Sequence, residues 1–239
     1  MHLIIIPTYN EINNVEIILE KLNNYRKTSD ILFIDDNSPD GTGKKLDNLS
    51  LKYKNTYILH RKKKEGIGSA HIFGLMWAYE NNYKTVVTMD CDFTHSPEDI
   101  QKFFEKKNEA DLVVGTRFHM QNGLAGWSLI RKIITYIGHF MTLIFLNITY
   151  DSTGAFRLYN ISKIKKEIFL KVQAPGYAFF FKSIFLISFN NYTIIEIPIS
   201  LSPRAAGKSK MTTKDAIDGI LELLKIFALR IFYRSKLKV

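Results

Sequence analysis

The segment TVVTMDCDFTH, residues 85–95, indicates the fold because a strand-like run passes directly into a polar cluster. The run is rich in β-branched and apolar residues, as expected of a buried strand. Two carboxylates, Asp90 and Asp92, follow where the strand ends. Residues two apart on an extended backbone point to the same side, which brings these two negative charges close together. We therefore expect a divalent cation or a positively charged partner between them.

The same segment belongs to a longer alternation of strands and helices. Further strand-like runs occupy 3–7, 31–35, 56–60, 112–115 and 194–198. Helix-like segments occupy 11–26, 42–53, 69–81 and 97–107. Regular alternation over the first 115 residues predicts an α/β fold with a mostly parallel sheet covered by helices on both faces.

Polar clusters follow three of these predicted strands. They are PTYNE (7–11), DDNSPDGT (35–42) and DCDFTH (90–95). Each cluster alone fits ordinary turn and cap chemistry, which favours Asp and Asn. Ligands of parallel sheets bind at the carboxyl ends of the strands, where all three clusters are expected to meet. Their convergence predicts a functional site.

The chain has 239 residues, 46% of them hydrophobic, which fits one large domain with an appendage. Lys and Arg number 33 against 23 acidic residues, a net charge of +10 that favours an anionic partner. A membrane surface, a phosphorylated substrate and nucleic acid are the candidates. Nucleic acid is disfavoured because the basic residues gather around phosphate-sized motifs and at the C-terminus. The single cysteine, Cys91, excludes an internal disulfide.

The C-terminal segment 215–239 has apolar residues at helical spacing, with acidic residues early and basic residues late, which suits a helix dipole. Its end, RIFYRSKLKV, combines basic and aromatic residues, as helices at membrane interfaces do. A core helix with a solvated basic end is the alternative. No signal peptide is expected, and the best candidate for a membrane span, 133–150, is marginal in length and interrupted by polar residues. We expect a domain over 1–210 and an amphipathic helix over 211–239.

Nine short motifs occur along the chain. They are PTYNE (7–11), DDNSPDGT (35–42), RKKKEGIGSA (61–70), MDCDFTHSPE (89–98), VVGTRF (113–118), GWSLIRKIIT (126–135), DSTGAFRLY (151–159), GYAF (176–179) and EIPISLSPRAAGKSK (196–210). Together they resemble the GT-A glycosyltransferases, and more narrowly the dolichol-phosphate (polyprenyl-phosphate) mannose synthases among the inverting family 2 enzymes. The resemblance implies a GT-A (Rossmann-like) fold and transfer of a hexose, mannose from GDP-mannose, to a polyprenyl or dolichyl phosphate.

On the donor side, the resemblance assigns the nucleoside pocket to Pro7, Tyr9, Glu11, Ile34 and Asp36, and donor contacts to Asp90 and Cys91. Asp36 is expected to accept hydrogen bonds from the base or the ribose. The implied metal ligands are Asp90, Asp92 and Thr94, with Asp92 also catalytic. Their hard oxygen atoms suit Mg²⁺ or Mn²⁺, and such an ion would neutralise the diphosphate leaving group.

On the acceptor side, a lipid phosphate is already a nucleophile near pH 7, so no dedicated general base is required. The resemblance gives Arg117 and Arg131 catalytic roles in gripping this phosphate, with the hydroxyl of Thr135 nearby. Arg204 and Lys210 are expected to close over the donor phosphates. His95 is interpreted as structural and Asp151 as a positioning residue beside the sugar.

The sequence departs from the family pattern in two places. Phe181 and Lys182 stand where an acidic residue is usual after GYAF, so the identity of the transferred sugar stays undecided. Cys91 replaces the usual alanine between the two aspartates. The alternatives are a UDP-sugar-dependent transferase (glucose or GlcNAc) acting on a lipid phosphate or a glycan, and a non-catalytic relative. The expected location is the cytoplasm, at the cytosolic face of an anionic membrane, where a membrane partner subunit is possible.

Overall fold

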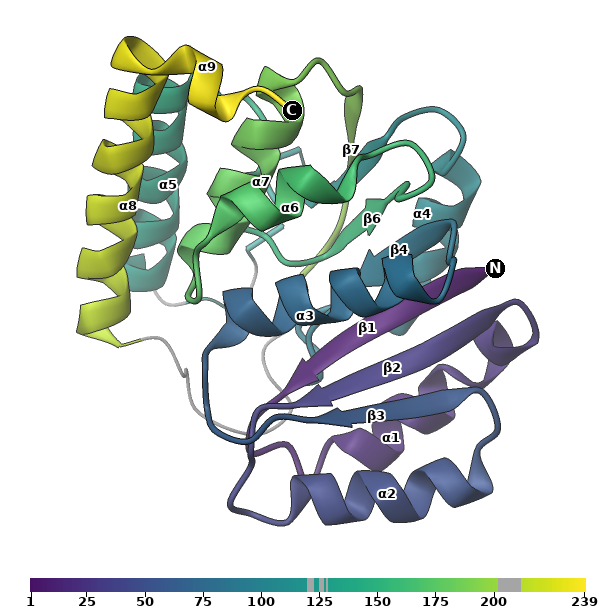
Figure 1. Ribbon diagram of the computed structural model, residues 1–239. Helices are drawn as coiled ribbons and strands as arrows, with labels where there is room; N and C mark the ends of the chain where they lie inside the picture. The colour runs from purple at the N-terminus through teal and green to yellow at the C-terminus, as the bar shows by residue number, and fades with distance from the viewer. Residues whose placement is uncertain (120–122, 125–126, 128, 202–211) are drawn as a thin grey trace.

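The computed structural model describes residues 1–239 except 120–122, 125–126, 128 and 202–211, and of residues 130 and 131 it describes the backbone alone. Within the described part of the chain, seven strands form one sheet in the order β3-β2-β1-β4-β6-β5-β7 (Figure 1). The strands are β1 (His2–Thr8), β2 (Ser29–Asp35), β3 (Thr56–His60), β4 (Thr85–Thr88), β5 (Leu112–Thr116), β6 (Arg157–Tyr159) and β7 (Ile194–Pro198).

All the strand pairs are parallel except those of β6, which lies antiparallel between β4 and β5. Every residue of β2 is buried, as expected of a strand covered on both faces. The predicted mostly parallel α/β fold is confirmed. β6 was not predicted, because its three residues lie inside the polar motif DSTGAFRLY and show no apolar run of their own.

Helices cover both faces of the sheet. They are α1 (Val15–Lys21), α2 (Thr42–Lys52), α3 (Ile67–Glu80), α4 (Ile100–Lys106), α5 (Leu129–Leu146), α6 (Lys166–Val172), α7 (Ala178–Phe189), α8 (Thr213–Phe232) and α9 (Arg234–Leu237), with short 3-10 turns η1 (Asn23–Lys27) and η2 (Pro97–Asp99). Successive residues of β1 alternate between two cores: Leu3 and Ile5 pack on the side of α3, α6 and α7, whereas Ile4 and Ile6 pack on the side of α1, α2 and α4.

The C-terminal helix α8 runs alongside α5, and α9 turns back toward α6 and α7 (Figure 1). The start of α8 is fixed by a capping box, in which Thr212 and Asp215 bind each other's backbone N–H groups. Leu223 and Ile226 of α8, together with Leu237 of α9, belong to the same apolar core as the sheet. The predicted C-terminal helix therefore exists, and it packs against the α/β body.

Helices α5 and α8 expose many large apolar side chains, which we call the α5–α8 apolar surface. Its members are Leu129, Ile133, Ile134, Tyr136, Ile137, Phe140, Leu143 and Ile144 on α5, and Ile217, Ile220, Leu221, Leu224, Ile231 and Phe232 on α8. Many exposed apolar side chains on two neighbouring helices indicate an interaction site more often than single scattered ones do. Among the helices described, none combines the length and the apolar character needed to cross a bilayer.

Candidate active site

A cleft of ≈ 1040 Å³ opens at the carboxyl ends of β1, β4 and β5 and continues between α5 and α8. This is the edge of the sheet where the sequence predicted a site. Ten of the predicted site residues line it: Pro7, Tyr9, Glu11, Asp36, Asp90, Cys91, Asp92, Thr94, Arg117 and Thr135. The structure thus brings together residues from five of the sequence motifs.

Four predicted residues are not placed on this lining. Ile34 is fully buried in the core, because β2 ends beneath the cleft and the side chain packs against α3; a Cβ on Gly74 would lie 2.5 Å from its Cδ1. Its side chain therefore supports the pocket from below. The side chain of Arg131 and the whole of Arg204 and Lys210 lie outside the described residues.

The turn after β4 orients the predicted metal-binding carboxylates. Both the backbone N–H and the hydroxyl of Thr94 donate to Oδ1 of Asp92, at 3.1 and 2.5 Å. Nδ1 of His95 accepts the backbone N–H of Asp90 at 2.9 Å, and its ring stacks on Phe156. An Nδ1 that accepts a hydrogen bond leaves the proton of a neutral imidazole on Nε2. His95 thus holds the turn, in line with the structural role expected of it.

The donor set suits a hard divalent cation. The carboxylates of Asp90 and Asp92 and the hydroxyl of Thr94 supply oxygen atoms on one wall of the cleft. Among the described residues, no three His, Cys, Asp or Glu side chains come together as a metal cage. An ion such as Mg²⁺ typically binds through one or two carboxylates and completes its shell with substrate phosphates and water. The residues present therefore fit an ion that binds together with a diphosphate.

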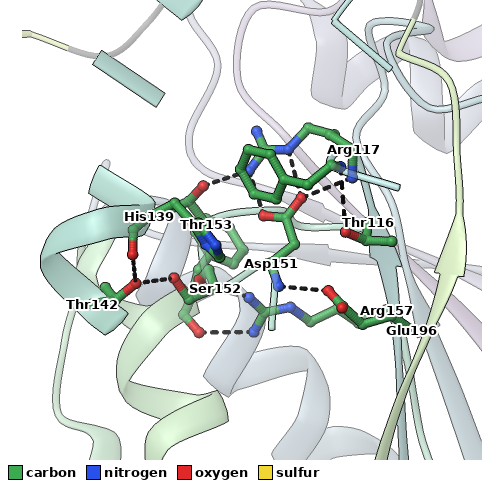
Figure 2. A network of polar contacts seen from close by, with 11 residues as sticks. Thr116, Arg117, His139, Thr142, Asp151, Ser152, Thr153, Arg157 and Glu196 are labelled. Atoms are coloured by element: carbon green, nitrogen blue, oxygen red, sulfur yellow. Dashed lines mark hydrogen bonds and ion pairs between the residues drawn. The ribbon is translucent and has the colours of Figure 1, made fainter. Parts of the chain in front are cut away.

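At the opposite wall, Arg117 forms a buried ion pair with Asp151 (Figure 2). Nε donates to Oδ2 at 2.8 Å, Nη2 donates to Oδ1 at 2.5 Å, and the backbone N–H of Arg117 also donates to Oδ2 at 3.0 Å. Burial would raise the pKa of Asp151, but the charge and hydrogen bonds of Arg117 outweigh it and lower the pKa. Nη2 of Arg117 also donates to the hydroxyl of Thr153.

Sequence reasoning did not pair these two residues. Arg117 directly follows β5 and Asp151 precedes β6, and the antiparallel pairing of those strands brings them together. The backbone N–H of Asp151 donates in turn to Oε1 of Glu196 on β7, at 2.6 Å. Since β6 was not predicted, the contact between Arg117 and Asp151 was not predicted either.

A second buried cation, Arg157, lies beneath the cleft and was not singled out from the sequence. Its guanidinium is fully buried and donates to the carbonyl of Phe180 and the hydroxyl of Ser183, both at 2.9 Å. It also donates to the carbonyl of Ser152 at 3.0 Å (Figure 2). These bonds tie β6 to α7 and to the turn that carries Asp151. The charge of Arg157 also helps to lower the pKa of Asp151.

At the predicted nucleoside end, Asp36 binds the loop that follows β3. Its two carboxylate oxygens accept the backbone N–H groups of Glu65 and Gly66 at 3.0 and 2.9 Å, and Oδ1 pairs with Arg61 at 2.8 Å. Gly66 has a φ of +94°, and a Cβ there would lie 2.7 Å from the carbonyl oxygen of Pro175, so a glycine is required. A hydrogen bond from Asp36 to a base or ribose stays a prediction.

Tyr9 faces Lys64 across this end of the cleft, with the ammonium 3.9 Å from the centre of the ring. The neighbouring loops are tied together by Asp40, which accepts the backbone N–H of Ile12 and both the N–H and the hydroxyl of Thr42. Burial would raise the pKa of Asp40, but these hydrogen bonds outweigh it and lower the pKa. The loop after β1 is therefore fixed against the loop after β2.

The far end of the cleft is apolar. Side chains of Ile134, Ile137 and Met141 on α5 line it, and so do Ala216, Ile220 and Leu223 on α8. Gly138 and Gly219 also line it, and a Cβ on either would meet nothing within 4 Å. The cleft thus joins a carboxylate-bearing end to an apolar groove between two helices.

The side chains of Phe181 and Lys182, which depart from the family pattern, lie in two different environments. Phe181 lines the cleft, as does Phe180. Lys182 instead pairs with Glu222 of α8 at 2.6 Å. The lysine ammonium is thus directed to an interface between helices.

Comparison with known proteins agrees with this geometry. Residues 3–185 match the model of the family described as glycosyl transferase family 2. The chain is 35% identical over 212 residues to an undecaprenyl-phosphate mannosyltransferase of Micrococcus luteus, a match that covers 88% of this chain and 87% of the relative. It is 30% identical over 213 residues to a polyprenol monophosphomannose synthase of Mycolicibacterium smegmatis, covering 88% and 80% of the two chains.

A solved mannosyltransferase of Pyrobaculum calidifontis, in complex with GDP-Man and Mn²⁺, superposes with a TM-score of 0.56 at 14% identity, covering 94% of this chain and 64% of that one. At this identity the likeness concerns the fold. The family match and the two sequence relatives, each covering most of the chain, go further. This chain is a member of glycosyl transferase family 2, with the GT-A fold.

Proposed function

We propose that this transferase moves mannose from GDP-mannose to a polyprenyl phosphate, with inversion at the anomeric carbon. The observation that carries the proposal is the cleft itself, which joins the carboxylates of Asp90 and Asp92 to an apolar groove between α5 and α8. A nucleotide-sugar diphosphate needs the first feature and a lipid acceptor needs the second. The names of the two sequence relatives, which are polyprenyl-phosphate mannosyltransferases, point to the same pair of substrates.

On the donor side, we assign the cation site to Asp92 and Asp90, with Thr94 as the residue that orients Asp92. Mg²⁺ or Mn²⁺ bound there would neutralise the charge that develops on the departing diphosphate. Tyr9, Lys64 and Asp36 line the end of the cleft that we assign to the nucleoside. Arg204 and Lys210 keep their predicted role over the donor phosphates.

On the acceptor side, an oxygen of the lipid phosphate attacks the anomeric carbon as the bond to the diphosphate breaks. The phosphate is ionised near neutral pH, so the reaction needs orientation and positive charge in place of a general base. The pair with Asp151 engages Nε and Nη2 of Arg117, and we assign Nη1 to the acceptor phosphate. Arg131 and Thr135, on the first two turns of α5, supply the other contacts.

The α5–α8 apolar surface supports a membrane location for this groove. Its side chains supply apolar area, while Arg234, Lys236 and Lys238 at the end of the chain supply positive charge for anionic headgroups. We propose that the protein lies on the cytosolic face of a membrane, with 1–210 as the catalytic domain and 211–239 as a membrane-associated helix, alone or with a partner subunit.

A donor screen tests the proposal. Purified protein is incubated with GDP-mannose, UDP-glucose or UDP-GlcNAc and a short polyprenyl phosphate, with Mg²⁺, with Mn²⁺ or with a chelator. The expected result is a mannosyl phospholipid from GDP-mannose, formed only when a divalent ion is present. Product from a UDP-sugar would replace the donor assignment, and transfer to the dephosphorylated lipid alcohol would overturn the acceptor assignment.

A further inference from the structure

Helix α7, with the sequence AFFFKSIFLISF, contains one charged residue, Lys182, among apolar neighbours. Residues 178–187 of this helix are buried, and the side chain of Lys182 is 10% exposed. An ammonium group taken out of water in such surroundings is costly unless a partner compensates it. The helix therefore requires a carboxylate from elsewhere in the fold.

Glu222 of α8 is that partner. Nζ of Lys182 lies 2.6 Å from Oε2 of Glu222. The pair therefore joins α7 to α8, and its two residues are 40 positions apart in the sequence. Partial burial would raise the pKa of Glu222, but the hydrogen bond and charge of Lys182, followed by those of Lys225, outweigh it and lower the pKa. Glu222 is thus ionised at neutral pH.

The pair lies at the boundary between the cleft and the core. Leu223, next to Glu222, is buried and lines the cleft, and α8 lines the cleft from there toward its N-terminus, with Ala216 and Gly219 among the lining residues. Phe181, next to Lys182, lines the facing wall. A second polar contact holds the far end of α8, where Arg230 donates to the carbonyl of Phe145 on α5 at 2.8 Å.

From this arrangement we propose that Lys182 and Glu222 are positioning residues for acceptor binding. The ion pair holds the cleft-lining half of α8 at the distance from α5 and α7 that the acceptor groove requires. The proposal rests on the proposed function in one respect, namely that this groove takes the acceptor. Neither residue touches substrate.

Lys182 is more deeply buried than Glu222, so the two single variants should differ in the size of their effects. Glu222→Gln leaves the ammonium of Lys182 buried without a charged partner. Lys182→Gln leaves Glu222, whose side chain is 26% exposed and 3.4 Å from Lys225, with a second cation and access to water. Removing Glu222 should therefore displace α8 more than removing Lys182. The double variant Lys182→Gln/Glu222→Gln leaves no buried charge and should fold with α8 close to its native place.

The experiment measures steady-state kinetics and amide hydrogen exchange on the four proteins. In Glu222→Gln the KM for polyprenyl phosphate should rise on the order of tenfold, with a smaller rise in Lys182→Gln and recovery in the double variant. The KM for GDP-mannose should stay within about twofold in all of them. Exchange over residues 213–224 should accelerate in Glu222→Gln, while β1 and β2 keep their protection. The control is Glu109→Gln, which removes an exposed pair with Lys106.

The outcomes separate this proposal from the proposed function. Equal rises in both KM values, or native exchange over 213–224 in Glu222→Gln, would overturn the positioning role. If the unaltered protein transfers no sugar to polyprenyl phosphate, the proposed function fails, and hydrogen exchange still decides whether the pair holds α8. If Glu222→Gln does not fold, Lys182→Gln and the double variant carry the same comparison.

Discussion

The guanidinium of Arg117 and the carboxylate of Asp151 form a two-point ion pair within the cleft wall, with donor–acceptor distances of 2.8 and 2.5 Å. Asp151 is fully buried and Arg117 nearly so. Arginine is suited to such planar, bidentate recognition of a carboxylate. The pair fixes the orientation of a cation that the sequence assigned to the acceptor phosphate, and it offsets much of that cation's charge.

Asp151→Asn should therefore weaken both stability and acceptor binding. Breaking a buried pair by removing one charge costs about 3 kcal/mol of unfolding free energy, because the other charge stays buried without compensation. The KM for polyprenyl phosphate should rise more than the KM for the donor, because the guanidinium of Arg117 loses the carboxylate that fixes its orientation, and this loss outweighs the gain in net positive charge. Urea denaturation and steady-state kinetics measure the two effects. An unchanged unfolding midpoint would show that Arg117 finds equal compensation elsewhere.

The same pair predicts a pH dependence of stability. The pKa of Asp151 is lower in the folded protein than its usual value of 3.8, so the folded state holds this proton less readily than the unfolded state. The stabilisation is thus fully present above the unfolded pKa and is lost as the pH falls through the folded pKa. The unfolding free energy of the native protein should fall below about pH 4 more steeply than that of Asp151→Asn. Parallel curves from pH 6 down to pH 3 would contradict this assignment.

The sequence predicted the sheet and the polar edge because both depend on local signals. The period and composition of runs such as 3–7 and 31–35 mark strands, and parallel topology brings their carboxyl ends together. The partners of Asp151 and Lys182 depend on distant pairings instead. Arg117 meets Asp151 through the three-residue strand β6, and Lys182 meets Glu222 across 40 residues of chain. Neither pairing leaves a periodic signal, so the structure was needed to find them.

Asp92→Asn tests the cation site without disturbing the turn. The amide oxygen of Asn can still accept the two hydrogen bonds from Thr94, while the negative charge is lost. Turnover should fall about 10³-fold, because a bound divalent ion supplies several kcal/mol of transition-state stabilisation. The unfolding free energy should stay the same or rise slightly, since two neighbouring carboxylates repel each other. Near-normal turnover with a folded protein would remove Asp92 from the metal site.

Arg131→Ala tests the acceptor side on α5. A charge-assisted contact with a phosphate is worth about 1.5–3 kcal/mol, so the KM for polyprenyl phosphate should rise at least tenfold while the KM for GDP-mannose changes little. Lys132→Ala is the matched control: it removes the same charge from the next residue, which points about 100° around the helix. Equal effects on both substrates would place Arg131 in the donor half of the site.

The last prediction concerns the α5–α8 apolar surface and its membrane. Ile217→Lys/Leu221→Lys places two charges on exposed positions of α8, one turn apart, and should reduce co-sedimentation with anionic vesicles. Leu51→Lys is the control, because Leu51 is 85% exposed on α2, away from this surface. Thermal unfolding should remain close to native in both proteins, since all three side chains are exposed.

Binding that depends on both apolar area and charge should weaken as salt is added, because screening removes the attraction to anionic headgroups first. Charge reversal at Lys236 and Lys238 should lower binding at low salt and flatten the salt dependence, leaving the apolar contribution. Deleting 230–239 would be a poorer test, since Leu237 is buried and Lys171 binds the carbonyls of Lys236 and Lys238. Binding that survives high salt and alkaline carbonate would show deeper insertion than a surface contact. Equal binding by the native protein and Ile217→Lys/Leu221→Lys would mean that the α5–α8 apolar surface serves another partner, such as a membrane subunit.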